Sequence, residues 1–472
     1  MTCVVSAGSL VIQKFQTIAA VQGDTVRIQE EWLKEHGTGR KLGIVTLGCR
    51  LNQFESEAVA GQFRSLGWQD AGTDEECDLV VIDTCSVTDR ADQKARQAIR
   101  SAIRRNPEAV IAVTGCYTQT AANEIAAIPG VDYVLGNREK LDLPACMPEL
   151  AKQDSPVIRV SRPGRAGDRE FLSVSGFERH TRATLKIQDG CDVFCTYCIV
   201  PFTRGRSRSL RQDEILDQAR LLVEEQGFRE LVLTGVHIGD WGREQGASLA
   251  GLVQQLIRIP GLARVRLSSI EPWDISQALI ELMAGSEQFC SHLHAPIQSG
   301  SAEVLRAMGR RIDAAGLWRL LERMVEAIPD LGLGTDVIVG FPGEGEAQYQ
   351  ETLRMLRELP FSRLHVFPYS ERRGTRAVHF AGTVAPSERK RRCRELIALG
   401  EQKMQAFNDR HVGQTARVLV ESRVISGFSY GYTDNYIRVE LPASPERCGQ
   451  LVPVRLTHGD DSVMQGHILT AG

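Results

Sequence analysis

The sequence predicts a multidomain α/β protein: an N-terminal domain with a parallel sheet, a central partial (β/α)6 barrel and a small C-terminal antiparallel β-barrel. Two patterns predict this fold class. From residue 41 to about residue 403, apolar runs alternate with helical segments, which is typical of parallel α/β structure. Beyond that point, short alternating segments separated by Gly and Asp indicate a small antiparallel barrel.

Composition limits the functions that are possible. The 472-residue chain has 56 basic and 59 acidic residues, a formal charge of −3, so any nucleic-acid surface must be a local patch. Its 12 cysteines are too few and too uneven for a secreted disulfide framework, which favours a reducing, cytoplasmic location. No apolar run approaches the roughly 20 residues that span a bilayer, and no signal peptide is recognisable, so we expect a soluble protein without a membrane partner.

The pattern along the chain predicts five segments. Each boundary follows a change in composition or periodicity. The segments are residues 1–40, an extension of unknown role; 41–150, the N-terminal α/β domain; 151–180, a linker rich in charge, Gly, Pro and Ser; 181–403, the partial barrel; and 404–472, the small barrel.

Three βα units in the N-terminal domain each place a cysteine after the strand. The expected strands are residues 42–47, 79–82 and 110–113, with helices over 55–66, to about 105, and from near 120. The cysteines are Cys49, Cys85 and Cys116. Because parallel strands end at the same edge of a sheet, these thiols should converge into a cluster site. The alternative for each is a small apolar residue at a helix start; the remaining cysteines show no such register.

Six strand-like runs follow in the second half of the chain. They are residues 183–187, 230–233, 264–267, 292–297, 334–339 and 363–367, with helical stretches such as 212–226 between them. Six βα units predict an open relative of the (β/α)8 barrel, with function at the C-terminal ends of the strands.

The most informative motif follows the first of these runs. Cys191, Cys195 and Cys198 can hold one face of a cubane iron–sulfur cluster and leave one iron open for a small molecule. A structural zinc site would need a fourth ligand and usually a second paired knuckle, which is not present nearby. Three unrelated core cysteines are a weaker explanation, since packing cysteines are usually scattered.

A C-x3-C-x2-C loop after the first strand of a six-unit half-barrel resembles the radical S-adenosylmethionine (SAM) superfamily. The resemblance implies that the open iron binds the amino and carboxylate groups of SAM, and that electron transfer releases a 5′-deoxyadenosyl radical, with the protein positioning the cofactor. Tyr197 matches the aromatic position that lies against the adenine; packing on the cluster is the alternative.

Other strand ends match positions where the superfamily holds SAM. The candidates are Gly235, Glu271, Gln298 and Asp336, in the segments 233–239, 268–272, 298–300 and 336–344. Each segment alone would be interpreted as a turn or cap, and His237 is as well explained as a core histidine. Their order along the chain is what favours the cofactor.

Together the three domains resemble the methylthiotransferase family over residues 41–472, with a last domain similar to the RNA-binding TRAM domain. The segments 46–53 (TLGCRLNQ) and 201–209 (PFTRGRSRS) are most similar to the branch that modifies threonylcarbamoyladenosine beside the tRNA anticodon. The isopentenyladenosine branch usually has Phe-Gly-Cys-Gln-Met-Asn, and the ribosomal-protein branch Gly-Cys-Pro-Lys-Asn. Asp83, where Asn is common, and Ile312, where Tyr is common, depart from the family pattern without removing a ligand.

The family resemblance implies two 4Fe-4S clusters and SAM as cofactors. The cluster on Cys191, Cys195 and Cys198 would generate the radical that removes hydrogen from carbon 2 of the adenine. The other cluster, on Cys49, Cys85 and Cys116, would supply a methylated sulfur. A radical is needed because no side-chain base removes such a proton at neutral pH, so no acid–base dyad is expected. An electron donor such as flavodoxin or ferredoxin is implied; the sequence identifies no sulfur donor.

The anticodon stem-loop of tRNA is the expected partner. Two basic groups and one aromatic group could contact it through phosphates and unpaired bases. They are Arg90, Lys94, Arg96, Arg100, Arg104 and Arg105; Arg204, Arg206, Arg208 and Arg211; and Phe428, Tyr430, Tyr432 and Tyr436. Solvated helix faces and barrel packing explain these groups about as well.

Two alternatives to this function remain. The same chemistry could act on isopentenyladenosine or on a ribosomal-protein aspartate. A protein of a different class, a non-enzymatic iron–sulfur sensor that binds RNA, would share the cluster motifs but would make no 5′-deoxyadenosine.

Overall fold

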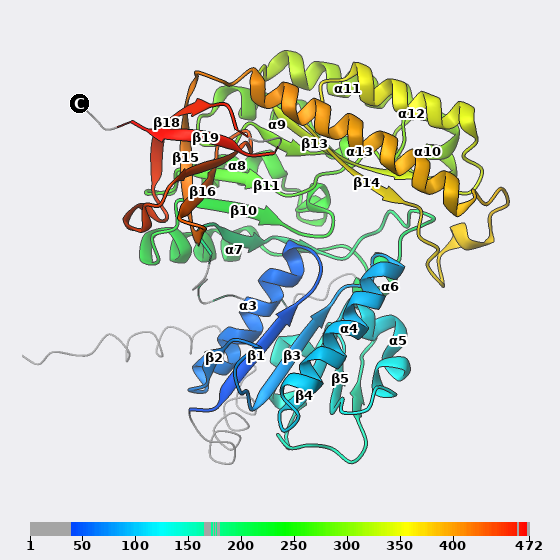
Figure 1. Ribbon diagram of the computed structural model, residues 1–472, viewed down its shortest axis with the longest axis vertical. Coiled ribbons are helices and arrows are strands. Elements are labelled where there is room, and N and C mark those ends of the chain that lie inside the picture. Colours follow the sequence, from blue (N-terminus) through cyan, green and yellow to red (C-terminus); the bar gives the residue numbers. More distant parts are fainter. Residues whose placement is uncertain are drawn as a thin grey trace, which may run out of the picture.

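The computed structural model describes residues 39–164, 171, 172, 174, 176, 180–459 and 462–469. The expected extension, residues 1–40, therefore lies outside the described residues except for its last two. The three expected architectures are all present, which confirms the fold class. Figure 1 shows the N-terminal domain against one side of the central domain, and the small barrel at the opposite end from α10.

The N-terminal domain is a parallel six-stranded sheet in the order β2-β1-β3-β4-β5-β6. Its central strands β3 and β4 are buried along their whole length, as expected for a parallel sheet covered on both faces. The strands are β1 Lys41–Thr46, β2 Gln69–Ala71, β3 Leu79–Thr84, β4 Val110–Gly115, β5 Tyr133–Leu135 and β6 Val157–Arg159, and the helices α3 Arg50–Ser65, α4 Asp89–Arg105 and α5 Cys116–Ala126.

Two helices of this domain begin earlier than the sequence suggests. Helix α3 starts directly after Cys49 and not near residue 55, and α5 starts at Cys116 and not near residue 120. The first turn of α3 lacks an apolar pattern because its buried side chains include Asn52 and Glu55, which are polar. Both helices therefore begin at or directly after a candidate cysteine.

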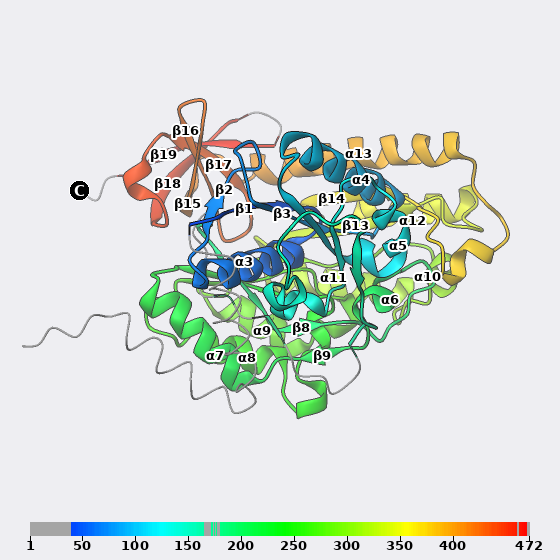
Figure 2. The same cartoon turned by 90° about the horizontal axis from the view of Figure 1, so that it is seen from below.

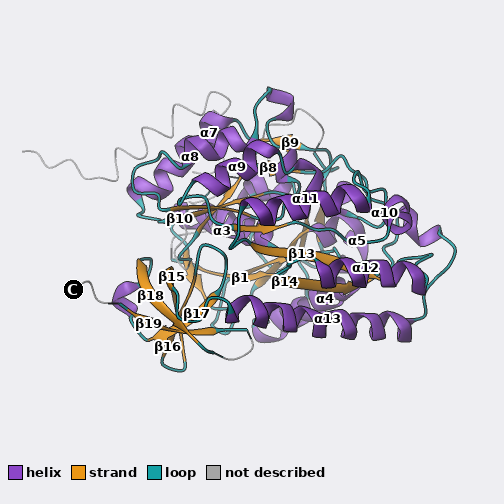
Figure 3. Ribbon diagram, turned by 90° about the horizontal axis from the view of Figure 1, so that it is seen from above, coloured by secondary structure: helices purple, strands orange, loops and turns teal. Residues whose placement is uncertain are grey.

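The central domain is a partial barrel of six parallel strands. Two three-stranded sheets, β7-β10-β11 and β12-β13-β14, meet through isolated bridges between β11 and β12, and helices cover the outside (Figure 3). The strands are β7 Ala183–Lys186, β10 Glu230–Thr234, β11 Arg264–Leu267, β12 His292–His294, β13 Gly332–Val339 and β14 Arg363–Pro368. The helices are α6 Val200–Arg204, α7 Gln212–Arg220, α8 Leu249–Leu256, α9 Gln277–Gly285, α10 Ala302–Met308, α11 Ala314–Ala327, α12 Glu346–Glu358 and α13 Pro386–Asp409.

The C-terminal domain is a closed barrel in the order β15-β16-β17-β19-β18. Its strands are β15 Thr415–Ile425, β16 Phe428–Tyr432, β17 Arg438–Pro442, β18 Leu451–Thr457 and β19 Met464–Ile468. Seen from below, the barrel lies on the same side of the view as β2 and on the opposite side from α10 (Figure 2). Closure leaves its strands without a free edge.

The structure corrects two details of the expected organisation. Residues 157–159, expected in a linker, form the edge strand β6 of the N-terminal sheet. Helix α13 continues through Met404 to Asp409, and the alternating pattern begins only at Thr415. The end of α13 is fixed because Phe407 is buried in the core of the small barrel. Helix α13 therefore crosses the boundary between the central domain and the small barrel. Apolar periodicity alone does not reveal this.

The N-terminal and central domains share a hydrophobic core. Phe54 and Ala58 of α3 belong to the same buried cluster as Leu185 of β7. This contact presents the carboxyl edge of the N-terminal sheet to the central domain. None of the helices in the described residues has the length and apolarity needed to cross a bilayer.

Candidate functional site

Cys49, Cys85 and Cys116 lie at the carboxyl edge of the N-terminal sheet, after β1, β3 and β4. The three lie close together: besides burial, the neighbouring Cys116 raises the pKa of both Cys49 and Cys85. Gly48 allows the approach of the first loop, because its φ is +114° and a Cβ there would lie 2.6 Å from the Cβ of Cys85. All three are free thiols.

Burial affects the ionisation of this trio. It raises the pKa of the Cys49 thiol, and it raises the pKa of Cys85 to about 12. Thiolates, not thiols, bind metals, so proton release must accompany the binding of iron here. Three free thiols, of which Cys85 and Cys116 are buried and Cys49 is exposed, fit an iron–sulfur cluster with one open iron.

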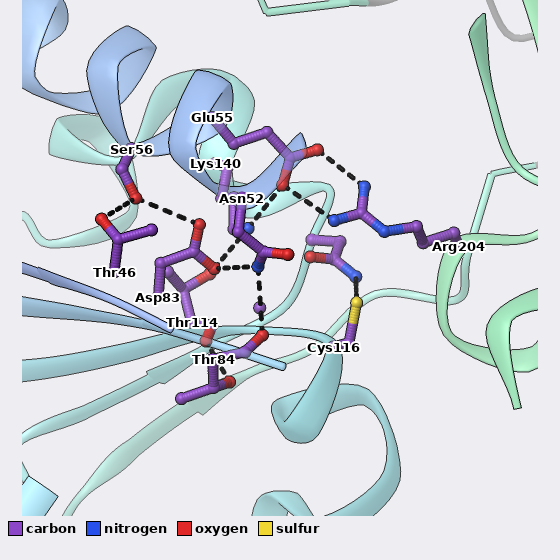
Figure 4. A network of polar contacts seen from close by, with 12 residues as sticks. Thr46, Asn52, Glu55, Ser56, Asp83, Thr84, Thr114, Cys116, Lys140 and Arg204 are labelled. Carbon is purple, nitrogen blue, oxygen red and sulfur yellow. Dashed lines mark hydrogen bonds and ion pairs between the residues drawn. The ribbon is translucent and has the colours of Figure 1, made fainter. Parts of the chain in front are cut away.

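A buried polar network supports the trio (Figure 4). Asn52 donates to the carboxylate of Asp83 at 3.1 Å, and Lys140 donates to Asp83 and to Glu55, both at 2.7 Å. Asp83 therefore binds a lysine ammonium group, and burial raises the pKa of its carboxyl. Although burial opposes it, Arg204 and Lys140 hold the pKa of Glu55 well below its usual range.

Cys191, Cys195 and Cys198 occupy the loop between β8 (Gln188–Asp189) and α6. The loop is held by Thr196, whose backbone N–H donates to the carbonyl of Met308 at 2.9 Å and whose hydroxyl donates to that of Ala307 at 2.9 Å. Burial raises the pKa of the Cys195 and Cys198 thiols, which also lie close to one another. This second free trio fits a cluster with one open iron in the same way.

Two charged groups adjoin the second trio. His237 Nδ1 lies 3.9 Å from Cys191 Sγ, and His237 Nε2 lies 2.5 Å from Asp274. Although burial alone would lower it, hydrogen bonds to Asp274 and Cys191 raise the pKa of His237 to about 10. Arg310 lies 4.0 Å from Cys195 Sγ and forms an ion pair with Glu271 at 2.6 Å.

Helix α6 joins the two trios. It begins two residues after Cys198 and ends at Arg204, and five helical residues rise only about 7.5 Å. The guanidinium of Arg204 binds Glu55 at 2.7 Å and lies close enough to Cys49 and Cys116 to affect their electrostatics. Both trios therefore face the same interface between the N-terminal and central domains.

Comparisons with known proteins agree with this arrangement. The model of an uncharacterized protein family, UPF0004, matches residues 41–136, and that of the radical SAM superfamily matches residues 185–356. Threonylcarbamoyladenosine tRNA methylthiotransferase MtaB of Bacillus subtilis (strain 168) is 39% identical over 417 residues, covering 87% of this chain and 92% of that protein. The chain belongs to the methylthiotransferase family. MtaB of Aquifex aeolicus (strain VF5) is 36% identical, covering 88% of this chain and 99% of that one.

Relatives from another branch of the methylthiotransferase family also match. The tRNA-2-methylthio-N(6)-dimethylallyladenosine synthase of Pelotomaculum thermopropionicum is 34% identical, covering 89% of this chain and 95% of that one. Among solved structures, the radical SAM methyltransferase TsrM of Kitasatospora setae superposes with a TM-score of 0.50 at 12% identity, over 83% of this chain and 77% of that one. That likeness shows the fold alone.

Three of the candidate SAM contacts of this methylthiotransferase follow successive strands of the partial barrel. Gly235 follows β10, and a Cβ there would lie 2.8 Å from the carbonyl oxygen of Gln188. Glu271 follows β11 and binds Arg310. Gln298 follows β12 with a φ of +67°, a conformation that non-glycine residues rarely adopt. Tyr197 packs edge-on against Phe341, with ring centroids 6.4 Å apart.

Asp336 lies within β13 and not after it. Its carboxylate is 3.0 Å from His294 Nε2 and 3.4 Å from His365 Nδ1. Although burial opposes it, hydrogen bonds to these histidines hold the pKa of Asp336 well below its usual range. The three side chains belong to adjacent strands, which is why the linear sequence does not associate them.

The expected RNA-contacting residues do not all lie on the surface. Arg204 was expected to contact phosphate, but it is buried and binds Glu55. Arg96 donates to Tyr117 at 2.6 Å. The other basic residues of α4, together with Arg206 and Arg211, are exposed. Of the barrel aromatics, Phe428 is exposed, whereas Tyr432 and Tyr436 stack on each other with centroids 4.7 Å apart.

Sequence reasoning missed Arg310, Asp274 and the role of Glu55 beside the two trios. Arg310 lies two residues before Ile312 in the segment Met308-Gly309-Arg310-Arg311, which carries no metal-ligand or cofactor motif. Glu55 has no motif around it, and its buried position in α3 depends on the docking of the central domain. Contacts of this kind arise between domains and leave no periodic signal.

Proposed function

We propose that this protein adds a methylthio group to carbon 2 of threonylcarbamoyladenosine next to the anticodon of tRNA. The single observation that supports it most is the pair of free cysteine trios at one domain interface, joined by α6 and Arg204. The names of the B. subtilis and A. aeolicus relatives favour this substrate.

Each trio would hold one 4Fe-4S cluster, with Cys191, Cys195 and Cys198 serving the SAM-binding cluster and Cys49, Cys85 and Cys116 the other. When bound, SAM and the two clusters supply the radical that removes hydrogen from carbon 2 and the methylated sulfur that replaces it. The chain's own residues position and shield these groups, as is usual for cofactor enzymes.

The residues around the second trio would bind SAM. Glu271 and Arg310 would meet its amino and carboxylate groups, because they are an ionic pair directly beside Cys195. Tyr197, Gly235, Gln298 and Asp336 would complete the site. The protonated His237 beside Cys191 would stabilise the thiolate form of that ligand.

The partner RNA would be the anticodon stem-loop, bound by the TRAM-like barrel and the exposed basic residues of α4. Reduction would need an electron donor such as flavodoxin or ferredoxin, and these partners would place the protein in the cytoplasm.

Two measurements test this function. Purified protein, reconstituted anaerobically and supplied with SAM and reductant, should form 5′-deoxyadenosine. Mass spectrometry of tRNA nucleosides from a deletion strain should show loss of methylthiolated threonylcarbamoyladenosine. Loss of methylthiolated isopentenyladenosine would assign the protein to the branch of the P. thermopropionicum relative, and unchanged tRNA with no 5′-deoxyadenosine would refute the proposal.

A further inference from the structure

Tyr436 lies where the three domains meet. The residue connects β16 to β17 of the small barrel and has a φ of +70°, in the left-handed region that a tyrosine rarely adopts. Its hydroxyl accepts a hydrogen bond at 2.5 Å from Arg50, the first residue of α3 and the neighbour of Cys49. Its ring stacks on His292 of β12 with centroids 4.4 Å apart. Strain of this kind is often kept where it has a function.

Four guanidinium groups surround this tyrosine. Their Cζ atoms lie 4.9 to 5.8 Å from its ring centroid. Although burial opposes it, Arg50 and Arg182 lower the pKa of Tyr436. The four are Arg50, Arg182, Arg266 and Arg363, and with Tyr436 they form what we call the Tyr436 cluster.

Two members of the Tyr436 cluster are not neutralised. Arg182 pairs with Glu421 at 2.7 Å, and Arg266 pairs with Glu230 at 2.8 Å. Among the residues that the structure describes, Arg50 and Arg363 form no ion pair with a carboxylate. Nearby, the Nδ1 atom of His292 is buried and also has no hydrogen-bond partner among those residues. Unpaired guanidinium groups of this kind favour binding of a carboxylate or phosphate.

The substrate of the proposed function carries such an anion close to its reacting carbon. In adenine, C2 and C6 flank the ring nitrogen N1, and C6 carries the N6 amino group. A substituent on N6 therefore lies near the reacting carbon C2. Arg50 follows Cys49, a ligand of the proposed N-terminal cluster, directly in the chain. The threonyl carboxylate therefore reaches this neighbourhood, whereas an isopentenyl group would bring no charge.

We propose that Arg50 and Arg363, oriented by Tyr436, bind the carboxylate of the threonylcarbamoyl group and thereby select this substrate over adenosines with uncharged N6 substituents. The proposal rests on the function proposed above and adds its specificity determinant. A backbone phosphate of the RNA would satisfy the same groups, so the experiment must separate these two anions.

The carboxylate and the phosphate are distinguished by measuring how anticodon stem-loops bind to the reconstituted holoenzyme. The enzyme is kept unreduced so that no turnover occurs during the measurement. Three RNAs are compared by fluorescence anisotropy: one with threonylcarbamoyladenosine, one with its methyl ester and one with unmodified adenosine. Loss of a hydrogen bond to a charged group should weaken the methyl ester relative to the acid by about tenfold or more in the native protein. Arg50→Gln should bring the ratio of the two affinities close to one, with little change in the affinity for the ester. Arg50→Lys should restore part of the preference for the acid.

The control is Arg354→Gln, which alters an exposed arginine of α12 outside the Tyr436 cluster and the proposed RNA contacts and should leave the ratio unchanged. Equal weakening of all three RNAs by Arg50→Gln would show a phosphate site and overturn the proposal, as would an unchanged ratio. If Arg50→Gln loses iron because Arg50 is next to Cys49, the same comparison is made with Arg363→Gln, which is not adjacent to a cysteine of either trio. If the native protein neither prefers the modified RNA nor methylthiolates it, the proposed function itself fails.

Discussion

Single residues decide whether the N-terminal trio can hold a cluster. Gly48 is the clearest case: its φ is +114°, and a Cβ at this position would lie too close to Cys85. A non-glycine residue at this position would strain the backbone by about 1 kcal/mol or more. Its Cβ would also clash with the Cβ of Cys85, which cannot move without displacing the thiol.

We therefore expect Gly48→Ala to lose the N-terminal cluster. The added Cβ would lie 3.2 Å from Cys85 Sγ as well as 2.6 Å from its Cβ, so the three thiols would no longer converge. Anaerobic iron analysis should fall from about eight to about four irons per chain. Gly39→Ala is the matched control: its φ is +88° but nothing lies within 4 Å of an added Cβ. Full iron content in Gly48→Ala would contradict this account.

At the scale of elements, the buried charges beneath the N-terminal trio join four pieces of the chain. Lys140, in the 3-10 helix Glu139–Asp142, binds Glu55 of α3 and Asp83 of β3, and Glu55 also binds Arg204 of α6. Lys140 has a side chain that is only 1% exposed. Removing one partner of a buried pair leaves an uncompensated charge, which costs more than the pair itself contributes.

Lys140→Met should consequently lower the free energy of unfolding by about 3–5 kcal/mol, measured by urea denaturation of the cluster-free protein. Adding Asp83→Asn should recover part of this loss, because it removes one of the two carboxylates that Lys140 neutralises. Lys152→Met provides the comparison: Lys152 is 38% exposed, and its partner Asp132 also accepts hydrogen bonds from the backbone N–H groups of Ile111 and Gln153. Because that carboxylate keeps two donors, the loss should be smaller than for Lys140→Met. Equal losses for the two lysines would disprove the role of burial.

At the scale of the whole molecule, each of the three domains contributes residues to one interface. The N-terminal sheet supplies one trio and the partial barrel the other, and the small barrel contributes Tyr436, which binds Arg50 next to Cys49. The trios share a face but no ligand, so each should assemble its own centre.

Replacing either trio with alanine should therefore halve the iron and sulfide content and leave the other centre intact. Cys191→Ala, Cys195→Ala and Cys198→Ala together should also abolish 5′-deoxyadenosine formation, whereas the variant that lacks Cys49, Cys85 and Cys116 should still produce it. Cys448→Ala, which changes an exposed cysteine outside both trios, should retain all of its iron. Loss of every iron atom in either triple variant would mean that one shared centre exists.

The fold class, most strands of the two α/β domains and the grouping of six cysteines into two trios can be predicted from the sequence. These features follow local rules: apolar runs alternate with helices, and residues after parallel strands meet at one edge. The strand at residues 264–267 agrees with β11 to the residue, and five of the six central strands are recognisable within about two residues.

The surroundings of the cysteines could not be predicted from the sequence and became visible only in the folded protein. Arg204 is a buried partner of Glu55, Asp336 joins two histidines from neighbouring strands, and Tyr436 of the small barrel meets arginines from both other domains. A buried charge is stable only where partners from distant segments compensate it. That compensation depends on how the domains dock, and a periodic pattern in one segment carries no information about it.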